Sequence, residues 1–125
     1  MSILLDSHAL LWALHAPAKL IASARAAIRD TRLGVYFSAA SAWELEIKIA
    51  KGKLTMPAGW LAAAEAAGLI HVPVTAEVAQ ASARLPWHHS DPFDRLLVAQ
   101  AAAQGWRIAT RDLWISAYDV QVLAC

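Results

Sequence analysis

The chain has 125 residues, which by the usual size of domains predicts a single domain over 1–125. A net charge of +1 argues against a strongly basic nucleic-acid binder, but not against an enzyme that handles phosphates through metal ions. The single cysteine, Cys125, excludes an internal disulfide. No apolar run is long enough to span a membrane and the first residues lack a basic leader, so we expect a cytoplasmic protein.

Strands and helices are expected to alternate along the chain, because short apolar runs alternate with longer segments of helical periodicity. In chain order the expected elements are a strand at 2–5, helices at 8–15 and 19–30, a strand at 35–37, helices at 41–54 and 57–67, a strand at 69–74, helices at 75–85 and 92–104, and strands at 107–110 and 120–123. Strands separated by helices predict an α/β fold of three layers, with about five mostly parallel strands flanked by helices.

Two helices carry clear signals at their ends. Ser41 and Glu44 have the spacing of a capping box, and Gly52 stands where a left-handed residue ends the same helix. Asp91 suits the N-cap of the last long helix, and Asp94 can accept a free backbone N–H in its first turn.

Four of the ten acidic residues fall just after a predicted strand or near the start of the helix that follows: Asp6, Glu44, Asp94 and Asp112. The carboxyl ends of parallel strands share one edge of a sheet, where such folds bind ligands. Carboxylates gathered there repel one another unless a cation joins them, and all-oxygen ligands suit Mg²⁺ or Mn²⁺ better than Zn²⁺. The pattern predicts that these residues are both metal ligands and catalytic groups. The alternative is that they are helix caps and solvated surface.

The chemistry that suits such a site is hydrolysis of a phosphodiester by water, because a bound cation orients the phosphate and stabilises the leaving oxygen. No serine is placed with a histidine and a strand-end acid in a recognisable triad. Haloacid-dehalogenase phosphatases need a second aspartate where His8 stands. Phosphoacceptor receiver domains need a late lysine, and none follows Lys53.

The chain resembles the PIN-domain family, and within it the VapC-type toxins, along nearly its whole length. The matching stretches are LLDSHALLWAL, SAASAWELEIKIAKGKL, HHSDPFDRLLVAQA, and IATRD followed by YDVQVL. The resemblance implies a five-stranded parallel sheet and a Mg²⁺- or Mn²⁺-dependent endoribonuclease that acts on RNA as the toxin of a toxin–antitoxin pair. It also implies a homodimer and a cognate VapB-like antitoxin. A non-catalytic PIN-like module that binds RNA or protein is the alternative function.

The same resemblance assigns roles to the four carboxylates. Asp6 and Asp94 correspond to the principal metal ligands, Glu44 to the acidic residue beside them, and Asp112 to the fourth member. Ser7 stands where threonine is common, a change that keeps the hydroxyl group.

Several residues near these acids have two possible roles. His88 and His89 either touch RNA or support the loop that carries them. The lysines Lys48, Lys51 and Lys53 form either a ridge for the RNA backbone or a solvated helix end. Arg95 and Arg111 each neighbour a predicted ligand and are candidates for phosphate contacts. The high apolar content, 58% of residues, predicts a surface that meets a partner protein.

Overall fold

The computed structural model describes residues 2–30 and 32–125, and these contain a five-stranded sheet in the order β3-β2-β1-β4-β5. The strands are β1 (Ile3–Leu5), β2 (Val35–Ser38), β3 (Ile70–Val72), β4 (Arg107–Thr110) and β5 (Val122–Ala124). Every neighbouring pair is parallel. The predicted mostly parallel sheet of about five strands is confirmed.

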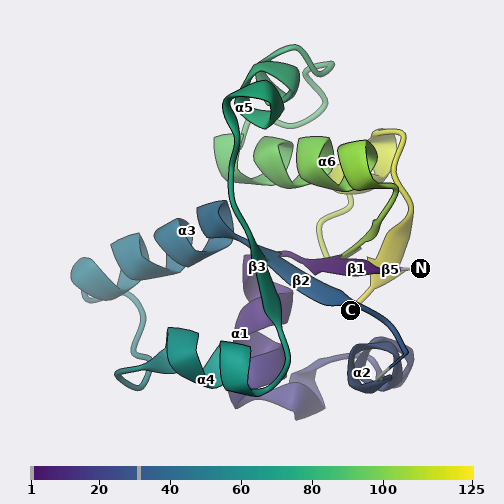
Figure 1. The fold of residues 1–125 in the computed structure, drawn as a ribbon. Helices are drawn as coiled ribbons and strands as arrows, with labels where there is room; N and C mark the ends of the chain where they lie inside the picture. Colours follow the sequence, from purple (N-terminus) through teal and green to yellow (C-terminus); the bar gives the residue numbers. More distant parts are fainter. Residues whose placement is uncertain (1, 31) are drawn as a thin grey trace.

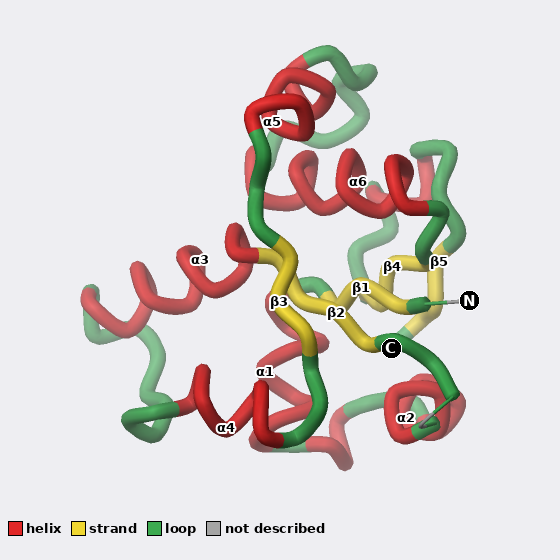
Figure 2. The backbone as a smooth tube through the Cα atoms, viewed as in Figure 1, coloured by secondary structure: helices red, strands yellow, loops and turns green. Residues whose placement is uncertain are grey.

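Helices cover both faces of this sheet, as Figures 1 and 2 show. They are α1 (Ser7–His15), α2 (Ala22–Arg29), α3 (Ala39–Ala50), α4 (Trp60–Ala66), α5 (Ala76–Ala83) and α6 (Pro92–Gln104), with short 3-10 turns η1 (Pro17–Lys19) and η2 (Ile115–Ala117). The pair α5 and α6 lies on one face, and α1, α2 and α4 lie on the other. The expected three-layer α/β architecture is therefore correct. None of the helices in the described part of the chain is long and apolar enough to cross a membrane.

The central strand β1 is buried on both faces, which explains its uninterrupted apolar sequence. Ile3 and Leu5 are fully buried in the cluster that includes α1, α2 and α4. Leu4 points to the opposite face and packs in the cluster that contains Leu97 of α6 and Ile108 of β4. Because side chains alternate along a strand, β1 packs against the helices on both faces of the sheet.

The start of α3 differs from the predicted capping box. Ser38, the last residue of β2, is the N-cap, and its Oγ accepts a hydrogen bond from the Ala40 amide at 3.0 Å. Ser41 lies inside the helix, buried, and its Oγ has no hydrogen-bond partner among the described residues. The prediction failed because strand and helix follow one another without a loop. The expected left-handed end at Gly52 is correct, with φ of 71°.

The strand order creates a crevice between β1 and β4 at their carboxyl ends. From β1 the chain moves outward to β2 and β3, and then returns to place β4 on the other side of β1. The two strands separate after Asp6, whose amide donates to the Ala109 carbonyl at 3.1 Å. In open parallel sheets, such a reversal of strand order is where ligands bind.

Candidate active site

A pocket of about 530 Å³ lies at this crevice, and all four predicted carboxylates line it. Asp6 follows β1, Asp112 follows β4, and Asp94 lies in the first turn of α6. Glu44 lies in the second turn of α3 rather than its first, because the helix begins earlier than expected. Four segments that are distant in sequence therefore bring acidic side chains to one place.

Asp6 is held by donors on both of its flanks. Its side chain caps α1, where Oδ1 accepts a hydrogen bond from the Ala9 amide at 2.7 Å, and it also hydrogen-bonds to Thr110. The residue is only 6% exposed. Burial raises the pKa of the Asp6 carboxyl, and the two hydrogen bonds oppose this shift.

Glu44 is held by a hydroxyl group and a lysine. The Ser7 hydroxyl donates to Glu44 Oε1, and Lys48 Nζ lies 3.8 Å from Glu44 Oε2, one turn further along α3. We call Asp6, Ser7, Glu44 and Lys48 the hydroxyl side of the pocket. Ser7 stands where threonine is common in the family that the sequence resembles. Its hydroxyl group contacts Glu44, which is one of the predicted ligands.

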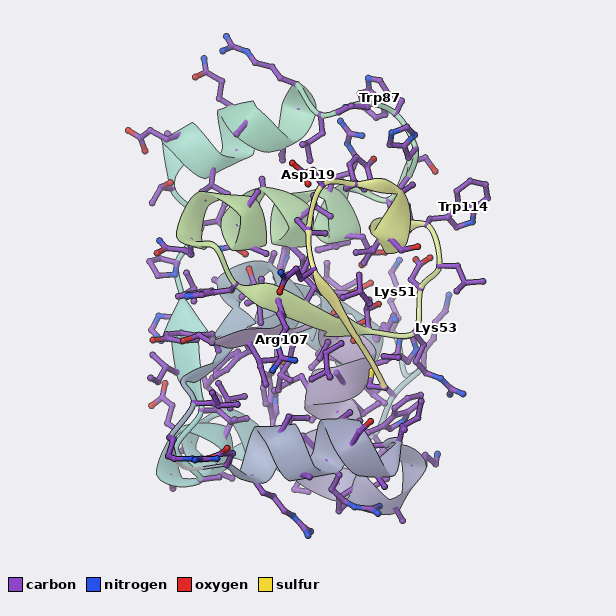
Figure 3. All side chains as sticks on the ribbon, turned by 90° about the vertical axis from the view of Figure 1, so that its right-hand side faces the viewer. Lys51, Lys53, Trp87, Arg107, Trp114 and Asp119 are labelled. Atoms are coloured by element: carbon purple, nitrogen blue, oxygen red, sulfur yellow. The ribbon has the colours of Figure 1, made fainter. Side chains whose placement is uncertain are left out.

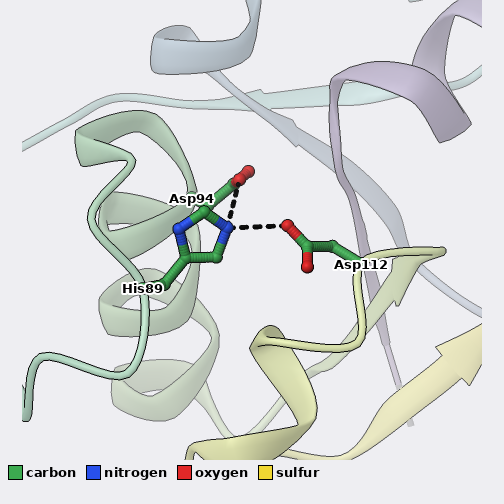
Figure 4. A group of neighbouring side chains, drawn as sticks. All are labelled: His89, Asp94 and Asp112. Atoms are coloured by element: carbon green, nitrogen blue, oxygen red, sulfur yellow. Dashed lines mark hydrogen bonds and ion pairs between the residues drawn. The ribbon is translucent and has the colours of Figure 1, made fainter.

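In another part of the pocket lining, His89 lies between two carboxylates. Its Nε2 atom is 3.0 Å from Asp94 Oδ2 and 2.6 Å from Asp112 Oδ2 (Figure 4). We call His89, Asp94 and Asp112 the histidine side. Asp91 is the N-cap of α6, as predicted, and its Oδ1 accepts from the Phe93 amide at 2.9 Å. Asp94 lies in the first turn of the same helix, and its Oδ2 lies 3.0 Å from His89 Nε2.

The charge state of Asp94 reflects this crowded position. The pKa of the Asp94 carboxyl is raised to about 7, chiefly by burial and also by the negative charges of Asp91, Asp6 and Asp112, whereas His89 opposes the shift. A carboxylate whose ionised form is disfavoured by burial and by other carboxylates is a favourable partner for a cation.

The donor chemistry fits a hard divalent cation. Carboxylate oxygens reach the pocket from both sides, and oxygen donors are the ligands that Mg²⁺ and Mn²⁺ prefer. Asp94, Asp112 and His89 form a tight cluster of potential ligand atoms, all within 4.8 Å of one another. Asp6 and Glu44, on the hydroxyl side, line the same pocket but lie outside that cluster.

The two arginines near the predicted ligands have different positions. Arg111 lines the pocket, with its guanidinium carbon 4.9 Å from the centre of the Trp12 ring. Arg95 is 3% exposed, and its guanidinium donates to backbone carbonyls instead of facing the pocket. The expectation that Arg95 contacts phosphate is therefore wrong. The sequence offered no signal for this role, because the carbonyls belong to the end of α5 and to the loop after it, whose path depends on the tertiary structure.

Comparisons with known proteins agree with this architecture. A chain of the VapBC2 complex of Rickettsia felis, solved with a DNA fragment from its promoter, superposes with a TM-score of 0.75 at 12% identity, covering 98% of both chains. DNA-bound VapBC from Salmonella typhimurium gives 0.71 at 15% identity, covering 98% of this chain and 97% of that one. FitAcB from Neisseria gonorrhoeae gives 0.62 at 22% identity, covering 98% and 96%.

These identities establish a shared fold only. No match was found among proteins of curated function. The model of the PIN domain family, however, matches residues 3–120. Because this match spans nearly all of the sheet, its helices and the four acidic positions, the chain belongs to the PIN-domain family.

Proposed function

We propose that this protein is a metal-dependent endoribonuclease that serves as the toxin of a toxin–antitoxin pair. One observation carries the proposal. Asp6, Glu44, Asp94 and Asp112 come from four distant segments and line one pocket at the crevice between β1 and β4. Carboxylates converging at such a crevice bind a cation, and a bound cation makes phosphodiester hydrolysis possible.

In this proposal the four carboxylates hold Mg²⁺ or Mn²⁺, with Asp6 and Asp94 as the principal ligands. A cation bound there would supply an activated water and would stabilise the charge on the leaving oxygen. Ser7 orients Glu44 through its hydroxyl group, while Lys48 and Arg111 on the pocket wall attract the phosphate backbone. Water adds to phosphorus as the bond to the 3′ oxygen breaks. The 3′ oxygen takes up a proton, and the other product carries a 5′-phosphate.

A covalent mechanism has less support from the side chains. Burial raises the pKa of the Cys125 thiol to about 11, and the negative charge of Asp6 contributes to the same shift. The thiol therefore stays protonated near neutral pH and is a poor nucleophile.

The proposed antitoxin and homodimer rest on exposed apolar side chains and on the structural neighbours. Large apolar residues that are well exposed include Trp43, Trp87, Leu113 and Trp114, and the last is 65% exposed. Trp87 and Trp114 project from the surface (Figure 3). The similar structures are of VapBC and FitAB complexes, and a cytoplasmic partner of the VapB kind fits such a surface.

Cleavage of RNA by the purified protein tests the enzymatic proposal. With Mn²⁺ we expect products that carry a 5′-phosphate, and EDTA should abolish cleavage reversibly. Asp6→Asn and Asp94→Asn should each reduce the rate by about 100-fold or more, because each removes a ligand. Asp119→Asn, at an exposed position outside the pocket, is the matched control.

Two outcomes would contradict the proposal. Cleavage that persists in EDTA, or products with a 2′,3′-cyclic phosphate, would establish a metal-free mechanism. RNA or protein binding with no cleavage under any metal would favour the non-catalytic module instead.

A further inference from the structure

The loop between α5 and α6 (residues 84–91) places His89 in the pocket, where its imidazole contacts carboxylates of both α6 and the β4 loop. Its Nε2 atom contacts Asp94 and Asp112 at 3.0 and 2.6 Å. Figure 4 shows the ring between the two acids. Groups that hydrogen-bond to metal-ligating carboxylates orient them and raise the affinity for the metal.

The other ring nitrogen determines which atom carries the proton. The Asp91 amide donates a hydrogen bond to His89 Nδ1 at 3.0 Å. An accepting Nδ1 carries no hydrogen, so the neutral ring carries its proton on Nε2 and presents a donor to the two carboxylates. For Nε2 to ligate a metal, this proton would have to move to Nδ1, where it would meet the Asp91 N–H. His89 is therefore arranged as a hydrogen-bond donor and not as a metal ligand.

Arg95 fixes the backbone that carries His89. Its guanidinium is buried, has no carboxylate partner among the residues that the structure describes, and stacks on Trp87 with its carbon 3.6 Å from the ring centre. It donates instead to carbonyls in the last turn of α5 and in the loop. The accepting carbonyls include those of Ser82, Leu85, Pro86 and His89, at 2.8, 3.0, 3.0 and 3.2 Å.

Tyr118, which follows η2 in the segment between β4 and β5, holds the same loop from the α6 face of the sheet. Its hydroxyl accepts from the His89 amide at 3.0 Å and donates to the Pro86 carbonyl at 2.7 Å. Arg95 also donates to this hydroxyl, at 3.2 Å. The backbone of His89 is thus held at both its N–H and its carbonyl, which leaves the imidazole little freedom to leave the carboxylates.

We propose that His89 is a positioning residue, which holds Asp94 and Asp112 at the separation that a divalent cation requires, and that Arg95 and Tyr118 hold His89 in place. This inference rests on the proposed metal site, and it adds the residue that positions two of the four proposed ligands. It assigns to the α5–α6 loop a role in metal affinity, although the loop contributes no ligand.

Calorimetric titration with Mn²⁺ alone tests this role. His89→Leu should weaken Mn²⁺ binding by about 10- to 100-fold, the range expected for losing a group that orients a ligand. His89→Gln should regain much of the affinity, because its amide N–H reaches the same carboxylates. His15→Leu is the matched control, since His15 is exposed at the end of α1 and does not line the pocket.

A double variant tests the route through the loop. Tyr118→Phe removes only the hydroxyl and should weaken Mn²⁺ binding, but should add nothing in the His89→Leu background. Fully additive effects would overturn the proposed route.

Nitrogen-15 NMR of the imidazoles gives a readout on the parent protein that does not depend on variants folding. His89 should keep an unprotonated Nδ1 and a protonated Nε2 with and without Mg²⁺. A Mg²⁺-dependent loss of the Nε2 proton, or unchanged or tighter Mn²⁺ binding by His89→Leu, would overturn the inference alone. A parent that binds neither metal would reject the proposed function as well.

Discussion

The two sides of the pocket hold their carboxylates by different means. On the hydroxyl side, Asp6 receives a hydrogen bond from an amide three residues away, and Glu44 is paired with a lysine four residues away. On the histidine side, Asp94 and Asp112 share one donor from a loop that precedes α6. Local helix geometry provides much of the first arrangement, whereas the second depends on the path of a loop.

This difference determines how each side responds to substitution. On the hydroxyl side each carboxylate has more than one partner, and one of them is local: the Ala9 amide for Asp6 and Lys48 for Glu44. The loss of one partner therefore leaves another in place. On the histidine side, Asp112 Oδ1 also accepts a hydrogen bond from the Trp114 amide at 2.9 Å, but the donor that joins Asp112 to Asp94 is the His89 imidazole. That imidazole depends on a buried guanidinium and a tyrosine hydroxyl. Substitutions that disturb the α5–α6 loop should therefore affect the positions of Asp94 and Asp112 but not those of Asp6 and Glu44.

The largest effect is expected from Arg95→Met. The variant keeps an apolar stem but leaves several buried carbonyls without a donor, so we expect a loss of about 3 kcal/mol in the free energy of unfolding. Urea denaturation in EDTA measures it. Arg84→Met, on an exposed neighbour, should stay within about 0.5 kcal/mol of the parent. Equal stability of the two variants would mean that the loop does not depend on its buried cation.

A medium effect, of opposite sign, is expected from Asp94→Asn without metal. The pKa of about 7 in the folded protein exceeds the usual value near 4 of an unfolded aspartate. The unfolded chain therefore ionises first, and Asp94 lowers stability increasingly as pH rises from about 4 to 7, and fully above that. In EDTA at about pH 8, Asp94→Asn should be more stable than the parent by on the order of 2 kcal/mol, after allowance for solvent screening.

The same variant separates cation binding from charge repulsion. At about pH 4 the advantage of Asp94→Asn should vanish, because the parent carboxyl is then protonated in both states. Saturating Mn²⁺ at alkaline pH should stabilise the parent more than the variant. Thermal melts with and without metal measure both effects. A variant that is less stable than the parent in EDTA at alkaline pH would show that Asp94 is held by its contacts and not strained by them.

Much of the fold and of the hydroxyl side could be predicted from the sequence. The strands are short apolar runs bounded by helices, and the acids at their ends fall at one edge by topology alone. Asp6 follows β1 directly, so its place in the pocket could be predicted once β1 was assigned correctly. The start of α3 was misplaced because Ser38 and Ser41 are both plausible caps, and only the junction with β2 decides between them.

The histidine side could not be derived in the same way. His89 and Asp112 are 23 residues apart, and their contact depends on the loop path that Arg95 stabilises. An arginine beside a predicted metal ligand suggested a phosphate contact, although its guanidinium is buried among carbonyls. Neither periodicity nor residue spacing could predict such a contact, because it depends on three segments that meet only in the folded protein.

The smallest effect is expected on the hydroxyl side, from Ser7→Ala. The change removes the hydroxyl that donates to Glu44, but Lys48 remains near the same carboxylate and Asp6 keeps its own donors. We expect a loss of about 1 kcal/mol in stability and a few-fold weaker binding of Mn²⁺, well below the effect of His89→Leu. Ser7→Thr, which keeps the hydroxyl, should restore both values. If Ser7→Ala weakened Mn²⁺ binding as strongly as His89→Leu, the two sides would depend equally on one donor, and the contrast between local and long-range support would fail.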